Sequence, residues 1–134
     1  MSEQPEGHSA VEDTMSYSAA AELSAVRAFV HSRGLALGLP TRRADLLTLA
    51  VSELATNTLQ YTTGGGRVRL WSEPGRLFCE IFDRGPLHAA LRDMPSADAM
   101  RGRGLAIVDR VCDAVSTHAL AHGTLVRLTF NLSG

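Results

Sequence analysis

The chain has 134 residues, of which 45% are hydrophobic and 20% charged, a composition typical of a single globular domain. Its 13 basic and 14 acidic residues give a formal net charge of -1, so no overall field favours nucleic acid or an anionic membrane as a direct partner. All 13 basic residues are arginine, and the absence of lysine excludes a P-loop and a Schiff-base site.

The cysteines and the apolar runs indicate a cytoplasmic protein. Cys79 and Cys112 stand in apolar runs, without the CxxC or Cys/His spacing of a metal site, and we expect them to be reduced core thiols. The N-terminal residues lack the hydrophobic segment of a secretory signal, and no apolar run is long enough to span a bilayer.

In chain order, residues 1–14 are polar and predict a flexible tail ahead of one domain over residues 15–134. A first helix is expected from about Ala19 to a glycine stop at Gly34 or Gly38, where a residue without a Cβ ends a helix readily.

A second helix is predicted from Thr41 to about Tyr61, and a hairpin follows in the alternating stretch "RVRLWSEPGRLFCEIFD". Residues 84–103 have weak periodicity and predict a long loop, which is usually functional or disordered. A third helix is expected from about Gly104, and the strands "AVSTHAL" and "TLVRLTFNL" close the chain. This order predicts an α+β fold, a two-layer sandwich with helices on one face of a mainly antiparallel sheet.

The second helix places two polar side chains inside its apolar arc. At about 100° per residue, Glu53 and Asn57 fall roughly 20° to either side of Leu46, one turn apart on the same face. One interpretation is a buried polar pair that bonds to the neighbouring sheet. The other is the floor of a ligand cavity, where an uncharged amide oxygen suits Mg²⁺ and a carboxylate can accept a proton.

Two further stretches carry polar or glycine-rich signals at the ends of elements. In "EIFDRGP" alternation puts Asp83 on the inward face, where its carboxylate needs a donor such as an exocyclic amino group; a turn-initiating aspartate is the alternative. In "RGRGLAIVD" Gly102 and Gly104 immediately precede a helix, which predicts either a phosphate site at the helix N-terminus or a flexible joint.

Taken together, these stretches resemble the GHKL ATPase superfamily over about residues 15–132. "ELATN" is similar to its N box, "DRGP" to a reduced G1 box, "GRGLAIV" to the G2 box and "HGT" to the G3 signal of the closing strand. Within the superfamily the chain most resembles the small anti-sigma factor serine kinases and the actinobacterial regulatory ATP-binding proteins. The resemblance implies a Bergerat-type ATP-binding fold with ATP and Mg²⁺ as ligands.

The resemblance also implies a role for each matching residue. Glu53 would be the general base toward a partner's serine, and Asn57 would bind the magnesium ion that bridges the phosphates. Asp83 would accept a hydrogen bond from the adenine amino group. The other implied nucleotide contacts are Gly85 beside the purine, Gly102, Arg103, Gly104 and Leu105 along the triphosphate, and Thr124 near the adenine.

The chain departs from the family pattern at three positions. The N box commonly continues Asn-Ala-x-x-His, and Thr58 and Tyr61 stand at the alanine and histidine places. The second glycine of the G1 box is replaced by Leu87. None of these changes removes the base, the magnesium ligand or the adenine anchor that the resemblance implies.

The leading hypothesis is an ATP-dependent kinase that phosphorylates a serine on a STAS-type anti-anti-sigma protein and regulates an RNA polymerase sigma factor by partner switching. A second hypothesis is a module that binds ATP and sequesters a protein partner with little or no phosphotransfer. A structural protein with coincidental boxes is the third. The resemblance also implies that homodimers can form through residues 15–30, which are apolar enough for this contact.

Overall fold

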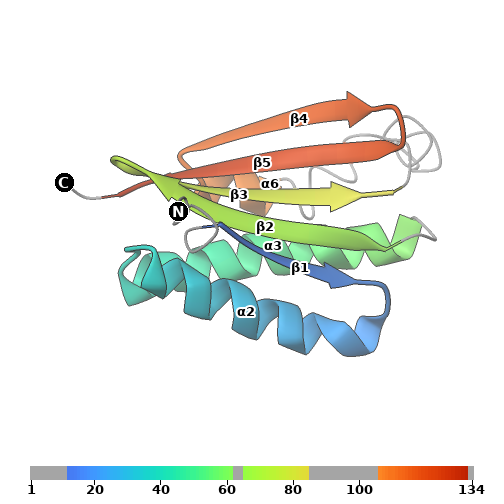
Figure 1. The fold of residues 1–134 in the computed structure, drawn as a ribbon, viewed down its shortest axis with the longest axis horizontal. Coiled ribbons are helices and arrows are strands. Elements are labelled where there is room, and N and C mark those ends of the chain that lie inside the picture. The colour runs from blue at the N-terminus through green and yellow to red at the C-terminus, as the bar shows by residue number, and fades with distance from the viewer. Residues whose placement is uncertain (1–11, 62–64, 85–105, 133–134) are drawn as a thin grey trace, which may run out of the picture.

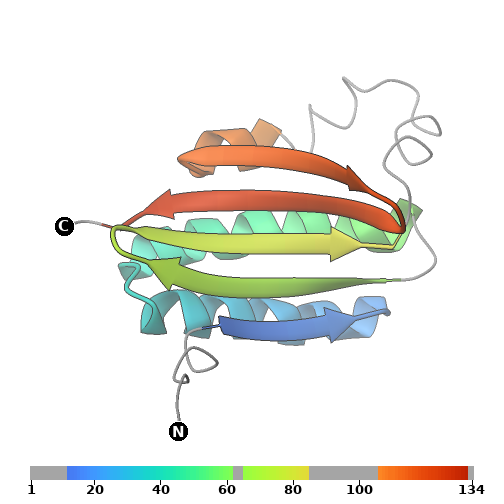
Figure 2. The same cartoon turned by 45° about the horizontal axis from the view of Figure 1, so that its top comes forward.

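The computed structural model of the chain describes residues 12–61, 65–84 and 106–132. In chain order the elements are β1 (Glu12–Tyr17), the 3₁₀ turn η2 (Ala20–Glu22), α2 (Leu23–Ala36), α3 (Thr41–Tyr61), β2 (Gly66–Glu73), β3 (Arg76–Asp83), α6 (Ala106–Val111), β4 (Ala114–Leu120) and β5 (Gly123–Asn131). The strands form one five-stranded sheet in the order β1-β2-β3-β5-β4, and every neighbouring pair is antiparallel. The helices lie together on one face of this sheet (Figures 1 and 2). The predicted α+β sandwich is confirmed.

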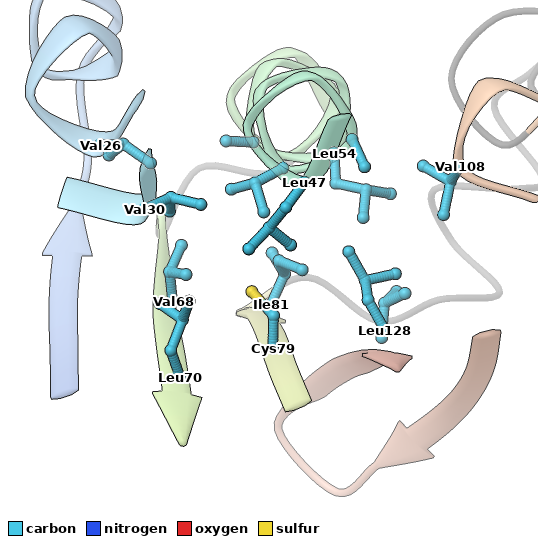
Figure 3. Packing of buried hydrophobic residues seen from close by; sticks show 14 of the residues in the cluster. Val26, Val30, Leu47, Leu54, Val68, Leu70, Cys79, Ile81, Val108 and Leu128 are labelled. Atoms are coloured by element: carbon cyan, nitrogen blue, oxygen red, sulfur yellow. The ribbon is translucent and has the colours of Figure 1, made fainter. Parts of the chain in front are cut away.

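The core lies between the helices and the inner face of the sheet. Helix α3 contributes Leu47, Val51 and Leu54, which are spaced so that they point to one side of the helix. Figure 3 shows Leu47 and Leu54 facing the alternating inward residues of the strands, among them Ile81 and Leu128. This continuous apolar layer fixes α3 over the middle of the sheet.

Strand β1 was not predicted. It pairs with β2 along the edge of the sheet and begins at Glu12, so residues 12–14, which were assigned to the tail, belong to the sheet. Its side chains alternate, with Thr14 exposed and Met15 packed against the core. Such a short edge strand with few apolar residues has too weak a period to be read from sequence.

The remaining elements follow the predictions closely. Helix α2 ends near Gly38, which has φ 118°, and the Leu39 amide donates to the Gly34 carbonyl at 3.0 Å. Helix α3 has the predicted bounds, and Gly75, with φ 80°, turns the predicted hairpin. Strand β4 spans the predicted residues, and β5 begins one residue earlier than expected.

Both cysteines are free thiols, as expected. Cys79 is buried and Cys112 is half-buried. Burial raises the pKa of Cys79, which keeps its thiol protonated. None of the described helices is both long and apolar enough to cross a membrane.

Candidate nucleotide-binding site

Helix α3 presents Glu53 and Asn57 at the border of its buried face. Both side chains are half-buried, as Leu46 is, whereas Ala50 and Leu54 are buried. Among the residues that the structure describes, neither Glu53 nor Asn57 makes a hydrogen bond or an ion pair. Two half-buried polar groups one turn apart, without partners in the described chain, can receive a ligand.

Strand β3 ends in Asp83, at the same end of the fold as the end of α3. Asp83 pairs with Gly66 of β2 and with Thr124 of β5. It shares the strand face of the buried Cys79 and Ile81, so alternation directs its carboxylate toward the helix layer. Thr124 is only 2% exposed and lies directly opposite Asp83, which is the neighbourhood expected from the sequence.

Tyr17 and Thr58 join this group, although sequence analysis gave neither a role. Burial raises the pKa of Tyr17 to about 12; the neighbouring Thr58 hydroxyl lowers it, and the charge of Asp83 raises it further. Thr58 is buried, and its hydroxyl donates to the Leu54 carbonyl at 3.0 Å. Residues from β1, α3 and β3 therefore form one polar cluster, which no local sequence pattern could have indicated.

Two glycines allow the close approach of the strands around Asp83. A Cβ on Gly66 would lie 2.6 Å from both the Phe82 carbonyl oxygen and the Tyr17 hydroxyl. A Cβ on Gly123 would overlap the Asp83 carbonyl oxygen and lie 2.9 Å from the Phe82 ring. Gly123 was noted in the sequence as part of "HGT", and the structure gives the reason for a glycine there: β5 begins directly against the backbone of Asp83.

Replacing Gly123 with alanine is expected to destabilise the protein by about 1–3 kcal/mol, the usual cost of overpacking. The added methyl group must push the start of β5 away from β3, because it meets backbone atoms that cannot rotate away. Urea unfolding followed by circular dichroism measures the change. Gly34→Ala is the matched control: that Cβ lies 3.4 Å from Leu39 and Leu47, and alanine is the better helix former, so stability should stay equal or rise. Equal stability of Gly123→Ala and wild type would contradict the prediction.

The raised pKa of Tyr17 predicts a loss of stability in alkali. The phenol ionises near pH 10.0 when unfolded and near pH 12 when folded. The unfolded chain therefore binds fewer protons between these values, and stability falls as pH rises. The full loss is about 3 kcal/mol for a shift of this size. Urea midpoints measured over roughly pH 9–12 should fall more steeply in wild type than in Tyr17→Phe. Parallel profiles would contradict the assignment.

Several predicted nucleotide contacts lie outside the described residues: Gly85, Gly102, Arg103, Gly104 and Leu105. The predicted site residues that the structure describes are Glu53, Asn57, Asp83 and Thr124. No group of three or more His, Cys, Asp or Glu residues that could hold a metal occurs in the described part of the chain. The half-buried amide of Asn57 offers an uncharged oxygen, a donor of the kind that Mg²⁺ prefers.

Comparisons with known proteins agree with this architecture. Residues 17–130 match the family of the histidine kinase-like ATPase domain. The fold is similar to the crystal structure of the RsbU and RsbW domains of Rv1364c from Mycobacterium tuberculosis, with a TM-score of 0.66 and 18% sequence identity over 91% of this chain. This chain spans 33% of that solved chain. A comparison with curated proteins found no match. Because the family match covers most of its length, the chain belongs to the histidine kinase-like ATPase domain family.

Proposed function

We propose that this chain is an ATP-dependent protein serine kinase of the anti-sigma factor type. One observation carries the proposal: the half-buried Glu53 and Asn57, without partners among the described residues, stand on α3 near the strand end that carries Asp83 and Thr124. A base, an oxygen ligand for magnesium and an adenine acceptor are then available on adjoining elements. The family membership supports ATP as the nucleotide.

Asp83 and Thr124 would hold the adenine at the end of the sheet. The carboxylate of Asp83 accepts the exocyclic N–H, and the buried Thr124 opposite it supplies a hydroxyl beside the ring. A small number of precisely placed polar groups fixes the orientation of a bound ligand and gives the site its specificity. The antiparallel pairing of β3 with β5 provides that rigidity.

Glu53 would act as general base during phosphoryl transfer. It takes the proton of a partner's serine hydroxyl while the serine oxygen bonds to the γ-phosphorus and the bond to the β-phosphate oxygen breaks, which releases ADP. Magnesium, when bound, would neutralise charge that develops on the phosphate oxygens, with Asn57 as its protein ligand. The substrate serine lies on a STAS-type antagonist, and the same kinase would bind a sigma factor when the antagonist is phosphorylated.

A second candidate function is ATP-dependent sequestration of a protein partner with little phosphotransfer. The departures at Tyr61 and Leu87 favour it, because tyrosine cannot carry the charge of a protonated histidine and Leu87 replaces the second glycine of the G1 box. The two functions differ in ADP production. A kinase produces one ADP for each phosphorylated STAS partner, whereas a sequestering module binds ATP and leaves it intact.

Calorimetric titration of ATP with and without Mg²⁺ tests the site first. Wild type should bind ATP more tightly with Mg²⁺ than without it. In Asn57→Ala this magnesium-dependent increase in ATP affinity should be smaller by about tenfold or more. Gln60→Ala is the matched control, because it removes a carboxamide from the exposed face of the same helix. Absence of adenine nucleotide binding by wild type would overturn the proposal, and equal behaviour of the two variants would remove Asn57 from it.

A further inference from the structure

The sheet face turned away from the helices carries a cluster of arginine and aromatic side chains. We call it the arginine–aromatic face, and it consists of Arg67, Arg69, Trp71, Phe78, Phe82 and Arg127. Strand register aligns these residues in adjacent rows: Arg69 and Arg127 flank Glu80 in one row, and Trp71 lies beside Phe78 in the next. None of the described helices covers this face (Figure 1).

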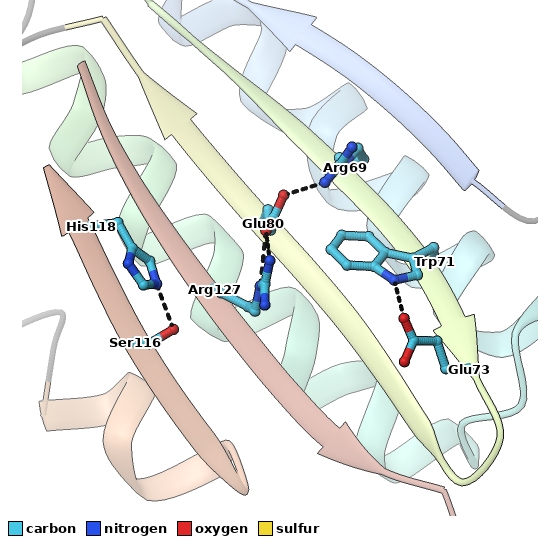
Figure 4. Close-up of polar contacts among 7 residues, drawn as sticks. All are labelled: Arg69, Trp71, Glu73, Glu80, Ser116, His118 and Arg127. Carbon is cyan, nitrogen blue, oxygen red and sulfur yellow. Dashed lines mark hydrogen bonds and ion pairs between the residues drawn. The ribbon is translucent and has the colours of Figure 1, made fainter. Parts of the chain in front are cut away.

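Glu80 holds two of the arginines in place. Its side chain is only 6% exposed. It accepts a hydrogen bond from Arg69 Nη2 at 2.6 Å and two from Arg127, through Nε at 2.8 Å and Nη2 at 2.7 Å (Figure 4). Charge-assisted bonds of this kind fix the guanidinium planes. The arginine side chains themselves stay 38% and 42% exposed, so fixed cations face the solvent.

Aromatic rings of this face pack against the guanidinium groups of the arginines. The Arg69 Cζ lies 4.5 Å from the centre of the Trp71 ring, and Trp71 stacks on Phe78 with 5.2 Å between ring centres. In the neighbouring row the Arg67 Cζ lies 5.3 Å from the centre of the Phe82 ring. Stacking orders long side chains before any partner arrives, which lowers the entropy cost of binding.

The face is locally positive on a chain whose net charge is -1. Arg67, Arg69 and Arg127 carry three positive charges beside the buried carboxylate of Glu80, and the carboxylate of Glu73 accepts a hydrogen bond from Trp71 Nε1 at 3.3 Å. At one end of the face, Glu73 and Arg76 are register partners of opposite sign and offset each other. Tryptophan and arginine held in fixed positions are the residues that contribute most often to protein–protein binding.

We propose that the arginine–aromatic face docks an acidic surface of a partner protein. Charge complementarity selects this occupant: carboxylates can pair with guanidinium groups that are already oriented. A second copy of the chain would bring two positive faces together, which repel. Single-stranded nucleic acid requires open ring faces for base stacking, but Arg69 covers Trp71 and Arg67 covers Phe82. The face lies on the opposite side of the sheet from Glu53 and Asn57, so docking and nucleotide binding can be tested separately.

Trp71 gives a direct readout, because it is the only tryptophan of the chain. The probe is a fluorescein-labelled peptide of repeating Glu-Leu-Asp-Val units, titrated against the full chain. We expect peptide anisotropy and Trp71 emission to change with the same midpoint. Arg67→Gln should weaken binding about fivefold, the effect of losing one charged contact, and added salt should weaken it further.

Arg42→Gln is the matched control, since it removes an exposed arginine from α3 in the other layer and should leave the midpoint unchanged. Arg67 has no ion pair with a described residue, so its replacement is not expected to unfold the protein; thermal unfolding checks this. Three results would overturn the proposal. These are no change in Trp71 emission, equal effects of Arg42→Gln and Arg67→Gln, or tighter Arg67-dependent binding of an oligouridylate or of a second copy of the chain.

Discussion

Replacing Asp83 with asparagine is expected to lower the affinity for ATP by about a hundredfold while the fold is retained. The carboxylate can only accept hydrogen bonds, and a charge-assisted bond from the adenine amino group is worth about 1.5–3 kcal/mol. Asparagine has nearly the same shape but places an N–H₂ group in the site, which can face the purine amino group and repel it. The backbone of Asp83 is held by its pairing with the buried Thr124, so the asparagine side chain starts from the same position.

Calorimetric titration with ATP measures this loss, and Glu73→Gln is the control because it neutralises an exposed carboxylate of the β2–β3 hairpin. A second readout does not depend on nucleotide. The negative charge of Asp83 contributes to the raised pKa of Tyr17, so Asp83→Asn should lower that pKa. Absorbance titration in a Tyr61→Phe background isolates Tyr17, since the chain has two tyrosines. Wild-type ATP affinity in Asp83→Asn would exclude Asp83 as the adenine anchor.

Replacing Glu53 with glutamine is expected to leave ATP affinity within about twofold of wild type and to slow phosphoryl transfer by about 10²–10⁴-fold, the usual contribution of a general base. The amide keeps the size of the side chain but cannot accept the serine proton. Because Glu53 is half-buried and has no partner among the described residues, its neutralisation breaks no ion pair in that part of the chain. Stability should therefore change little.

Single-turnover transfer from labelled ATP to a purified STAS-type partner measures the rate, with Glu73→Gln again as the control variant. If wild type transfers phosphate and Glu53→Gln does so at the same rate, Glu53 is not the base. If wild type binds ATP and the partner but transfers nothing, the sequestering function replaces the kinase. Neither result decides whether the chain binds ATP at this site. The ATP titrations of Asp83→Asn and Asn57→Ala test that separately.

The sequence by itself determined the elements whose periodicity is local. The apolar spacing along α3, the alternation in β3 and β5 and the glycine turn at Gly75 predicted the two-layer α+β sandwich, which the structure has. The same patterns placed Glu53 and Asn57 one turn apart on α3 and Asp83 at an inward strand end. These predictions succeed because the repeat of a helix or a strand is set by neighbouring residues in the chain.

Only the tertiary structure decided which distant residues meet. The contribution of β1, the meeting of Tyr17 with Thr58 and Asp83, and the pairing of Arg127 with Glu80 all join residues far apart in sequence. Strand order and register depend on how the whole core packs, and a shift of one residue would turn each of these side chains to the other face of the sheet. Local periodicity therefore predicts the two layers. The packing of the complete core decides which residues assemble into the candidate site and which assemble into the arginine–aromatic face.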